Sequence, residues 1–137
     1  MIRLWIYLCV LIISLPLAAK DVPFNSLPKE AVSFITTHFG ELKVEKVKLE
    51  SGVYVVDFTN DYELAFDSKG NWIVVDCDED AVPKDIIPQA ILEFVSKNFV
   101  GDVITQIEQS KGEYNIELQS DVSLLFDKKG KFLKLGN

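Results

Sequence analysis

The chain has 137 residues and a formal net charge of −7, from 14 basic and 21 acidic side chains. A length of this order suits one or two small domains. The acidic balance excludes nucleic acid as a partner, because binding to nucleic acid requires a basic face.

Residues 1–19 have the composition of a secretory signal peptide, since Arg3 precedes a short apolar run and small residues up to Ala19. The run is too short for a comfortable membrane span, and a retained anchor is the alternative. Cleavage near Ala19 predicts a periplasmic or secreted protein with no stable membrane span. Cleavage would also remove Arg3 and Cys9, which leaves 13 basic against 21 acidic residues (net −8) and Cys77 as a single thiol.

From residue 20 onward the predicted elements form two similar series. A helix is expected from Pro28 to Gly40 and again from Pro88 to Gly101, because apolar residues recur there at helical spacing. Strands are expected over residues 41–49, 53–59, 62–66 and 72–76, and then over residues 102–109, 113–119, 122–126 and 131–135. The short connections between strands predict antiparallel meanders.

A seven-residue motif occurs twice in these series, sixty positions apart. Residues 64–70 read Leu-Ala-Phe-Asp-Ser-Lys-Gly, and residues 124–130 read Leu-Leu-Phe-Asp-Lys-Lys-Gly. With the same offset, residues 27–75 align with residues 87–135 without a gap, and 11 of the 49 pairs are identical. The matches fall on apolar and turn positions, which predicts two copies of one fold.

The predicted fold class is therefore α+β: two tandem repeats, each with one helix packed on its own four-stranded antiparallel meander sheet. The expected domains are the signal peptide (1–19), a lead-in (20–26), the first repeat (27–76), an acidic linker (77–86) and the second repeat (87–137). Since repeats of about fifty residues are small for independent domains, we expect the two to pack on each other.

Side chains alternate between the two faces of a strand, which predicts a core face and an open face. The core face beneath the first helix would hold Tyr54, Val56, Phe58, Ile73 and Val75. The open face would be apolar in the first repeat and mostly polar in the second. Its predicted partner-binding residues are Val53, Val55, Ala65, Trp72, Val74 and Phe132. The alternative is that this patch packs against the second repeat or against a second copy in a homodimer.

No arrangement of residues in the sequence supports catalysis, so we predict a protein that is not an enzyme and uses no cofactor. Asp76, Asp78 and Asp80 alternate as in the first half of a calcium-binding loop. Ala81 and Ile87 occupy the positions of the loop's required glycine and glutamate, which excludes an EF-hand. These aspartates are weak metal candidates, and a solvated acidic linker is the competing interpretation.

The order of helix, Gly-x-Tyr strand and Phe-Asp-x-Lys-Gly turn, twice behind a signal peptide, resembles the PepSY-like family. Within it, the chain is similar to the secreted tandem-repeat group described as beta-lactamase-inhibitor-like. The resemblance implies an exported bacterial protein with helix-on-sheet modules that binds or inhibits another protein. It supplies no catalytic residue.

The sequence thus favours an exported, non-enzymatic binding module. Its expected role is to inhibit or regulate a periplasmic or secreted protein, such as a peptidase or an envelope enzyme. The alternative is an envelope protein that binds a metal ion or small ligand through the acidic linker. The predicted partner is a protein of the cell envelope, and a homodimer remains open.

Overall fold

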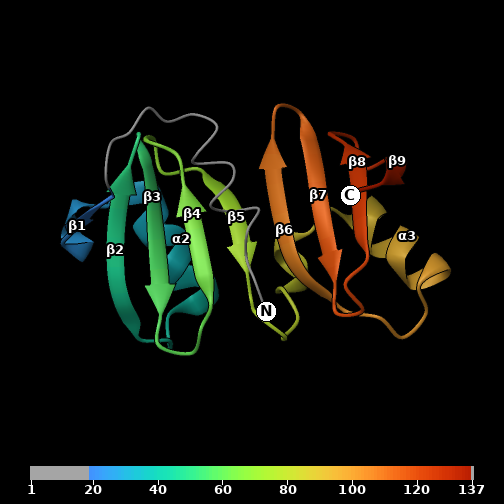
Figure 1. The fold of residues 1–137 in the computed structure, drawn as a ribbon, viewed down its shortest axis with the longest axis horizontal. Coiled ribbons are helices and arrows are strands. Elements are labelled where there is room, and N and C mark those ends of the chain that lie inside the picture. The colour runs from blue at the N-terminus through green and yellow to red at the C-terminus, as the bar shows by residue number, and fades with distance from the viewer. Residues whose placement is uncertain (1–18, 137) are drawn as a thin grey trace. The chain divides into compact units, whose positions relative to one another are not determined.

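The structure, a computed structural model, describes residues 19–136. The predicted signal peptide and Cys9 therefore lie outside the described residues, apart from Ala19. The chain divides into two compact units between Val74 and Val75. The strands and helices of the described residues are shown in Figure 1. In chain order they are β1 (Lys20–Val22), η1 (Phe24–Ser26), α2 (Lys29–Phe39), β2 (Val44–Glu50), β3 (Val53–Phe58), β4 (Glu63–Phe66), β5 (Trp72–Asp76), η2 (Lys84–Ile86), α3 (Gln89–Asn98), β6 (Ile104–Ser110), β7 (Glu113–Leu118), β8 (Ser123–Asp127) and β9 (Phe132–Leu135).

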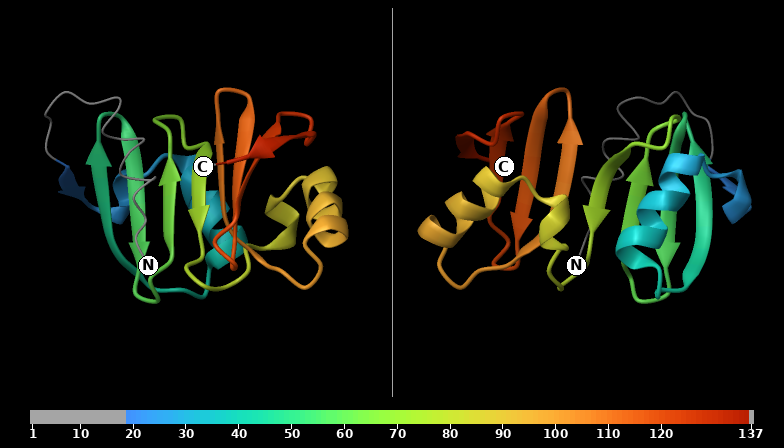
Figure 2. Two further views of the ribbon diagram at one scale, coloured as in Figure 1. Left: turned by 45° about the vertical axis from the view of Figure 1, so that its right-hand side comes forward. Right: turned by 180° about the vertical axis from the view of Figure 1, so that it is seen from behind.

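In the first unit, α2 covers one face of the strands and leaves the other face without a helix (Figure 2). The helix begins directly after Pro28, as the sequence predicts, and buries Ala31, Ile35 and Phe39. Its aromatic side chains meet those of the strands: the Phe39 and Phe58 ring centroids are 6.1 Å apart. This apolar layer between helix and strands is the core of the unit, and it fixes which strand residues point toward α2.

The second unit is built in the same way, with α3 over one face of β6, β7 and β8 (Figure 2). The helix buries Ile91 and Val95. Ile107 and Ile116 are directly opposite each other on β6 and β7, and both are fully buried. The edge of the Phe126 ring meets Phe94 of α3, with ring centroids 5.4 Å apart.

The prediction of two repeats, each with a separate four-stranded sheet, is wrong. The strands of the described residues form one nine-stranded antiparallel sheet in which they follow one another in chain order. Residues 20–22, which we expected to be a lead-in, form β1 and pair with β2. The strand predicted at residues 102–109 also has a neighbour on its far side, because the N–H of Cys77 donates to the carbonyl of Thr105 at 2.9 Å.

The repeated seven-residue motif forms the same turn in both units. Asp67 accepts hydrogen bonds from the backbone N–H groups of Lys69 and Asn71, each at 2.9 Å. Asp127 accepts the equivalent bonds from Lys129 and Lys131 at the same distance. Such bonds from an aspartate to its own turn are the usual reason for aspartate at this position.

These hydrogen bonds lower the pKa of both carboxyl groups. Burial raises the pKa of Asp67, but the hydrogen bonds from Asn71, Lys69 and Gly70 together outweigh that effect. At Asp127 the N–H of Lys131 is the largest cause of the lowered pKa. Both groups hold their turns as carboxylates at neutral pH, and a structural role accounts for them without any catalytic one.

The glycine that ends each copy of the motif lies against the start of the helix in its own unit. Gly70 has a φ of +93° and Gly130 a φ of +87°, a region that favours glycine. A Cβ atom on Gly70 would lie 2.9 Å from the Cβ of Pro28 and 3.0 Å from the backbone nitrogen of Ala31. The turn therefore needs glycine both for its conformation and for its close approach to the helix.

Candidate functional site

The face of the first unit that α2 leaves uncovered carries a compact apolar cluster. Four of the predicted partner-binding residues form it, and we call it the valine cluster: Val53, Val55, Ala65 and Val74, with Ile73 packed against them. Val55 is directly opposite Ala65 in the register of β3 and β4, which places both on the same face. The four side chains are only 2–9% exposed, so the cluster is a small second core and not an exposed patch.

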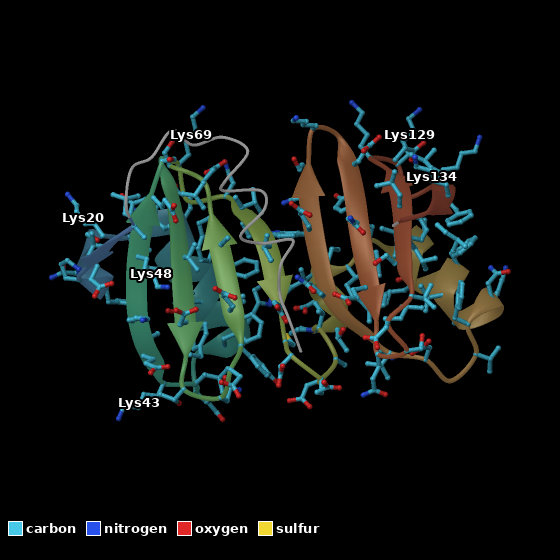
Figure 3. The ribbon with its side chains drawn as sticks, viewed as in Figure 1. Lys20, Lys43, Lys48, Lys69, Lys129 and Lys134 are labelled. Carbon is cyan, nitrogen blue, oxygen red and sulfur yellow. The ribbon has the colours of Figure 1, made fainter. Side chains whose placement is uncertain are left out.

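Charged side chains lie beside the valine cluster on the same face. The register of β2 and β3 places Lys48 opposite Val55 and Lys46 opposite Asp57. Lys48 and Asp57 form an ion pair, with their Nζ and Oδ2 atoms 4.0 Å apart. The two side chains are still 26% and 21% exposed, so water screens the pair and it contributes little to stability. Figure 3 shows Lys48 on this face of β2.

Trp72 and Phe132 do not lie on this face, contrary to the sequence prediction. The ring of Trp72 lies 6.3 Å from that of Phe34 on α2, and Phe132 stacks on Phe94 of α3 at 4.6 Å. The cause in β9 is a register shift: Leu125 is opposite Lys134, whereas Phe126 is opposite Phe132. The extra residue, Leu133, turns Phe132 to the helix side.

Ile73 shows the matching error in the first unit. The sequence placed its side chain beneath α2, but it packs against the valine cluster on the other side. Trp72 and Ile73 have therefore exchanged faces relative to strict alternation. Both aromatic residues predicted to bind a partner instead contribute to the core under the helix of their own unit.

The corresponding face of the second unit is polar, as the alternation predicts. Asn115 lies opposite Glu108 on one side and Leu125 on the other, and Leu125 lies opposite Lys134. Glu117 lies between Gln106 and Ser123 in the same way. Leu125 is the single large apolar side chain among these paired residues, so this face differs chemically from that of the first unit.

The acidic segment after β5 is more ordered than a solvated linker. Asp76 is only 2% exposed, and its Oδ1 atom accepts the backbone N–H of Asp78 at 2.9 Å. The segment is held to β6 because the N–H of Val82 donates to the carbonyl of Ile104 at 2.8 Å. Asp80 is exposed. Residues 19–136 contain no group of three histidine, cysteine, aspartate or glutamate side chains placed to hold a metal ion.

Cys77 is fully buried beside these aspartates. Burial, together with the negative charges of Asp76 and Asp80, raises the pKa of its thiol to about 12. A nucleophilic cysteine needs a lowered pKa and some exposure, and Cys77 has neither. The sequence interpretation of Cys77 as a buried strand-end residue is confirmed.

We predict that Cys77 is almost inert in the folded protein. At pH 8 a thiol of this pKa is ionised in only about 1 molecule in 10,000, and reagents reach it only when the segment opens. Reaction with a colorimetric disulfide reagent should be about 100-fold or more slower in buffer than in 8 M urea. Residues 20–137 are the right material, because they contain only this thiol. Equal rates in the two solvents would contradict the prediction.

A groove in the second unit was not predicted from the sequence. It has a volume of about 710 Å³ and lies between η2, α3 and the start of β6. Its apolar lining includes Val82, Ile87, Leu92, Val95 and Ile104. Of its acidic residues, Asp102 is already engaged by Ser120 and by the N–H of Val103. Two apolar residues, Val82 within the predicted linker and Ile87 directly after it, were the signal that this segment packs on a helix.

Comparisons with known proteins agree on one group. The family model described as "Putative beta-lactamase-inhibitor-like, PepSY-like" matches residues 17–65 and 52–134. A search of curated proteins found no match. Within residues 19–136, no helix is long and apolar enough to cross a membrane.

Three solved structures from Bacteroides are similar to this chain. A periplasmic protein of unknown function from Bacteroides vulgatus is 33% identical, with a TM-score of 0.84, over 88% of this chain and 100% of that one. A protein of Bacteroides thetaiotaomicron, described as a "putative calcium-regulated periplasmic protein", is 36% identical, with a TM-score of 0.83, over 87% and 97%. A second periplasmic protein of Bacteroides vulgatus is 35% identical, with a TM-score of 0.82, over the same shares.

Proposed function

Because the chain belongs to the PepSY-like, beta-lactamase-inhibitor-like family, we propose that it is an exported, non-enzymatic module that binds another protein of the cell envelope. The relatives described as periplasmic support export, and the signal-peptide composition of residues 1–19 agrees with it. The bound protein would be an enzyme or peptidase that this chain inhibits or regulates.

One observation carries the proposal: in the first unit, α2 covers a single face of the strands, and the opposite face combines the valine cluster with charged neighbours. Because the cluster itself is only 2–9% exposed, the accessible part of this face is formed by the charged strand residues beside the cluster. Exposed Lys46 and half-buried Lys48 lie next to the cluster and are available to a partner's carboxylates. Such a surface suits contact with a folded protein better than it suits enclosing a small substrate.

The test is capture from envelope extracts with residues 20–137, followed by affinity measurement with the purified captured protein. A Lys46→Glu/Lys48→Glu variant should bind that protein at least tenfold more weakly, because two attractive charges become repulsive. The matched control is Lys43→Glu/Lys69→Glu, which makes the same charge change at the two ends of the strands (Figure 3). Both variants replace side chains that are at least partly exposed, and thermal unfolding verifies that each remains folded.

Four results would separate the outcomes of these measurements. Weaker binding by the first variant alone supports this face as the binding surface. Equal binding by all three proteins contradicts it. A change in the captured enzyme's rate on addition of the chain would identify inhibition, whereas concentration-dependent self-association would favour a homodimer.

A second candidate is calcium binding by the segment from Asp76 to Asp80. It is favoured by the relative described as calcium-regulated, which is 36% identical to this chain. Carboxylates are the ligands that calcium prefers. Calorimetric titration with calcium chloride, beside magnesium chloride, tests it: heat that an Asp78→Asn/Asp80→Asn variant abolishes supports the site, and no heat removes it.

A further inference from the structure

The last strand of the sheet, β9, has one edge that no described strand covers. It stands at the end of the strand order and pairs with β8. The N–H of Gly136 donates to the carbonyl of Ser123 on β8 at 2.7 Å. The carbonyl of Lys131 also faces β8, since it accepts the N–H of Asp127 at 2.9 Å. Because backbone groups alternate in direction along an antiparallel strand, those of Phe132 and Leu135 point to the outer edge, whereas the alternation breaks at the extra residue Leu133.

The side chains of this edge strand are unusually apolar for an exposed position. Leu133 is 45% exposed and Leu135 is 64% exposed, and they are two of the four large hydrophobic side chains exposed in residues 19–136. Exposed edges are commonly protected by charge or by a covering element, because outward N–H and C=O groups accept further strands. Here the strand presents hydrogen-bonding groups together with apolar contact area.

The same hairpin is basic in an otherwise acidic protein. Residues 122–137 contain one aspartate and four lysines, a net charge of +3 in a chain of net charge −7. The lysines are all exposed: Lys128, Lys129, Lys131 and Lys134. Figure 3 shows Lys129 and Lys134 at the β8–β9 hairpin. A positive edge on a negative protein selects a carboxylate-bearing ligand.

The chain itself contains a precedent for strand addition at an edge of this kind. β5 follows the same Asp-x-Lys-Gly turn as β9, and it also begins with an aromatic residue packed on a helix. In the strand order β5 is followed by β6, and the N–H of Cys77, just past the end of β5, donates to the carbonyl of Thr105 in β6. The strand corresponding to β9 is thus followed by a further strand in the order, whereas β9 ends it.

From these observations we propose that the outer edge of β9 binds an extended, carboxylate-bearing segment of the partner protein as an additional strand. The proposal rests on the proposed function as a protein-binding module and adds a second, chemically defined contact to it. Backbone hydrogen bonds to Phe132 and Leu135 supply affinity, and the lysines select acidic sequences.

A second copy of this chain fits the edge less well. Antiparallel pairing of two β9 strands would bring Lys131 and Lys134 of both copies into one short ladder. Like charges in such a ladder destabilise pairing. The charge of the edge therefore favours a different, acidic chain over self-association.

The test uses residues 20–137 and a labelled synthetic peptide, Thr-Glu-Val-Glu-Val-Glu-Thr, with Thr-Lys-Val-Lys-Val-Lys-Thr as the charge-reversed probe. We expect the acidic peptide to bind, to slow amide exchange at Phe132 and Leu135, and to bind more weakly as salt rises. A Lys129→Glu/Lys134→Glu variant should bind it at least fivefold more weakly.

The matched control is again Lys43→Glu/Lys69→Glu, because Lys69 occupies in the first turn the place that Lys129 occupies in the second. This control should bind the acidic peptide as the unchanged protein does. Equal weakening in both variants, or bound peptide without protection at Phe132 and Leu135, would overturn the proposal.

No binding of either peptide would also overturn it, and so would protection of these amides by self-association at high protein concentration. If the Lys129→Glu/Lys134→Glu variant still captures the envelope partner with full affinity, the β9 edge is excluded while the proposed function stands. If no partner is captured at all, the peptide measurement still reports on the edge by itself.

Discussion

Gly70→Ala is expected to lower the free energy of unfolding by about 2–5 kcal/mol. About 1–2 kcal/mol comes from forcing a residue with a side chain into a left-handed conformation, since Gly70 has a φ of +93°. A further 1–3 kcal/mol, roughly, comes from overpacking, because the new Cβ would lie 2.9 Å from Pro28 and 3.0 Å from the backbone of Ala31. Urea denaturation measures the loss.

Gly52→Ala is the matched control for this prediction. Gly52 lies in the same unit with a φ of +81°, but a Cβ atom there would meet nothing within 4 Å. This variant should lose only about 1–2 kcal/mol, the conformational part alone. Equal losses in the two variants would mean that the contact between the turn and the helix adds nothing to stability.

Phe66→Ala is expected to cost about 3–5 kcal/mol, the range for truncating a large aromatic side chain in a core. Phe66 is fully buried, and its ring meets that of Phe34 on α2 edge-on, with centroids 5.7 Å apart. The loss removes apolar burial and the aromatic contact together, and it leaves a cavity that the rigid sheet cannot close. Since small domains are stable by only about 5–15 kcal/mol, thermal unfolding should shift strongly downward.

Phe24→Ala makes the same truncation at a position that is 39% exposed, in the same unit. It should cost about 1 kcal/mol or less, as exposed substitutions generally do. A comparable loss in both variants would show that Phe66 is not part of a tightly packed core. The pair therefore tests the assignment of the helix-facing side of β4.

Much of the local structure could be predicted from the sequence, because local signals determine it. Pro28 and Pro88 directly precede the two helices, as predicted. The turns around Asp67 and Asp127 form as the repeated motif indicates. The period of two along β3 also placed Val53 and Val55 correctly on the face away from α2. Turn chemistry and helix starts depend on a few adjacent residues, so a short stretch of sequence is enough.

The faces of β5 and β9 could not be predicted in this way. Counting by twos assumes an unbroken strand, and a single extra residue such as Leu133 shifts every later side chain to the other face. This error moved Trp72 and Phe132 from the helix side to the predicted binding surface. Nothing in the residues around Leu133 marks the shift, because Phe132 and Leu133 are both apolar and either of them could face the core.

The continuity of the sheet was also beyond the sequence patterns. β6 contains Thr105, Gln106 and Glu108, which suggest an exposed edge strand, yet all three are buried. A neighbouring strand that lies beyond an intervening helix leaves no periodic trace in the sequence of either strand. Polar side chains inside a sheet are therefore the kind of site at which pattern reasoning fails.

The order of the strands has a consequence for how the chain folds. Every described strand pairs with its neighbours in the sequence, from β1 to β9, so no pairing has to wait for a segment synthesised much later. Low contact order of this kind speeds folding, because the entropy lost in closing each loop is small. A chain that emerges gradually from a ribosome or a translocation pore can add strands to its growing edge one after another, and it exposes each unpaired edge only briefly.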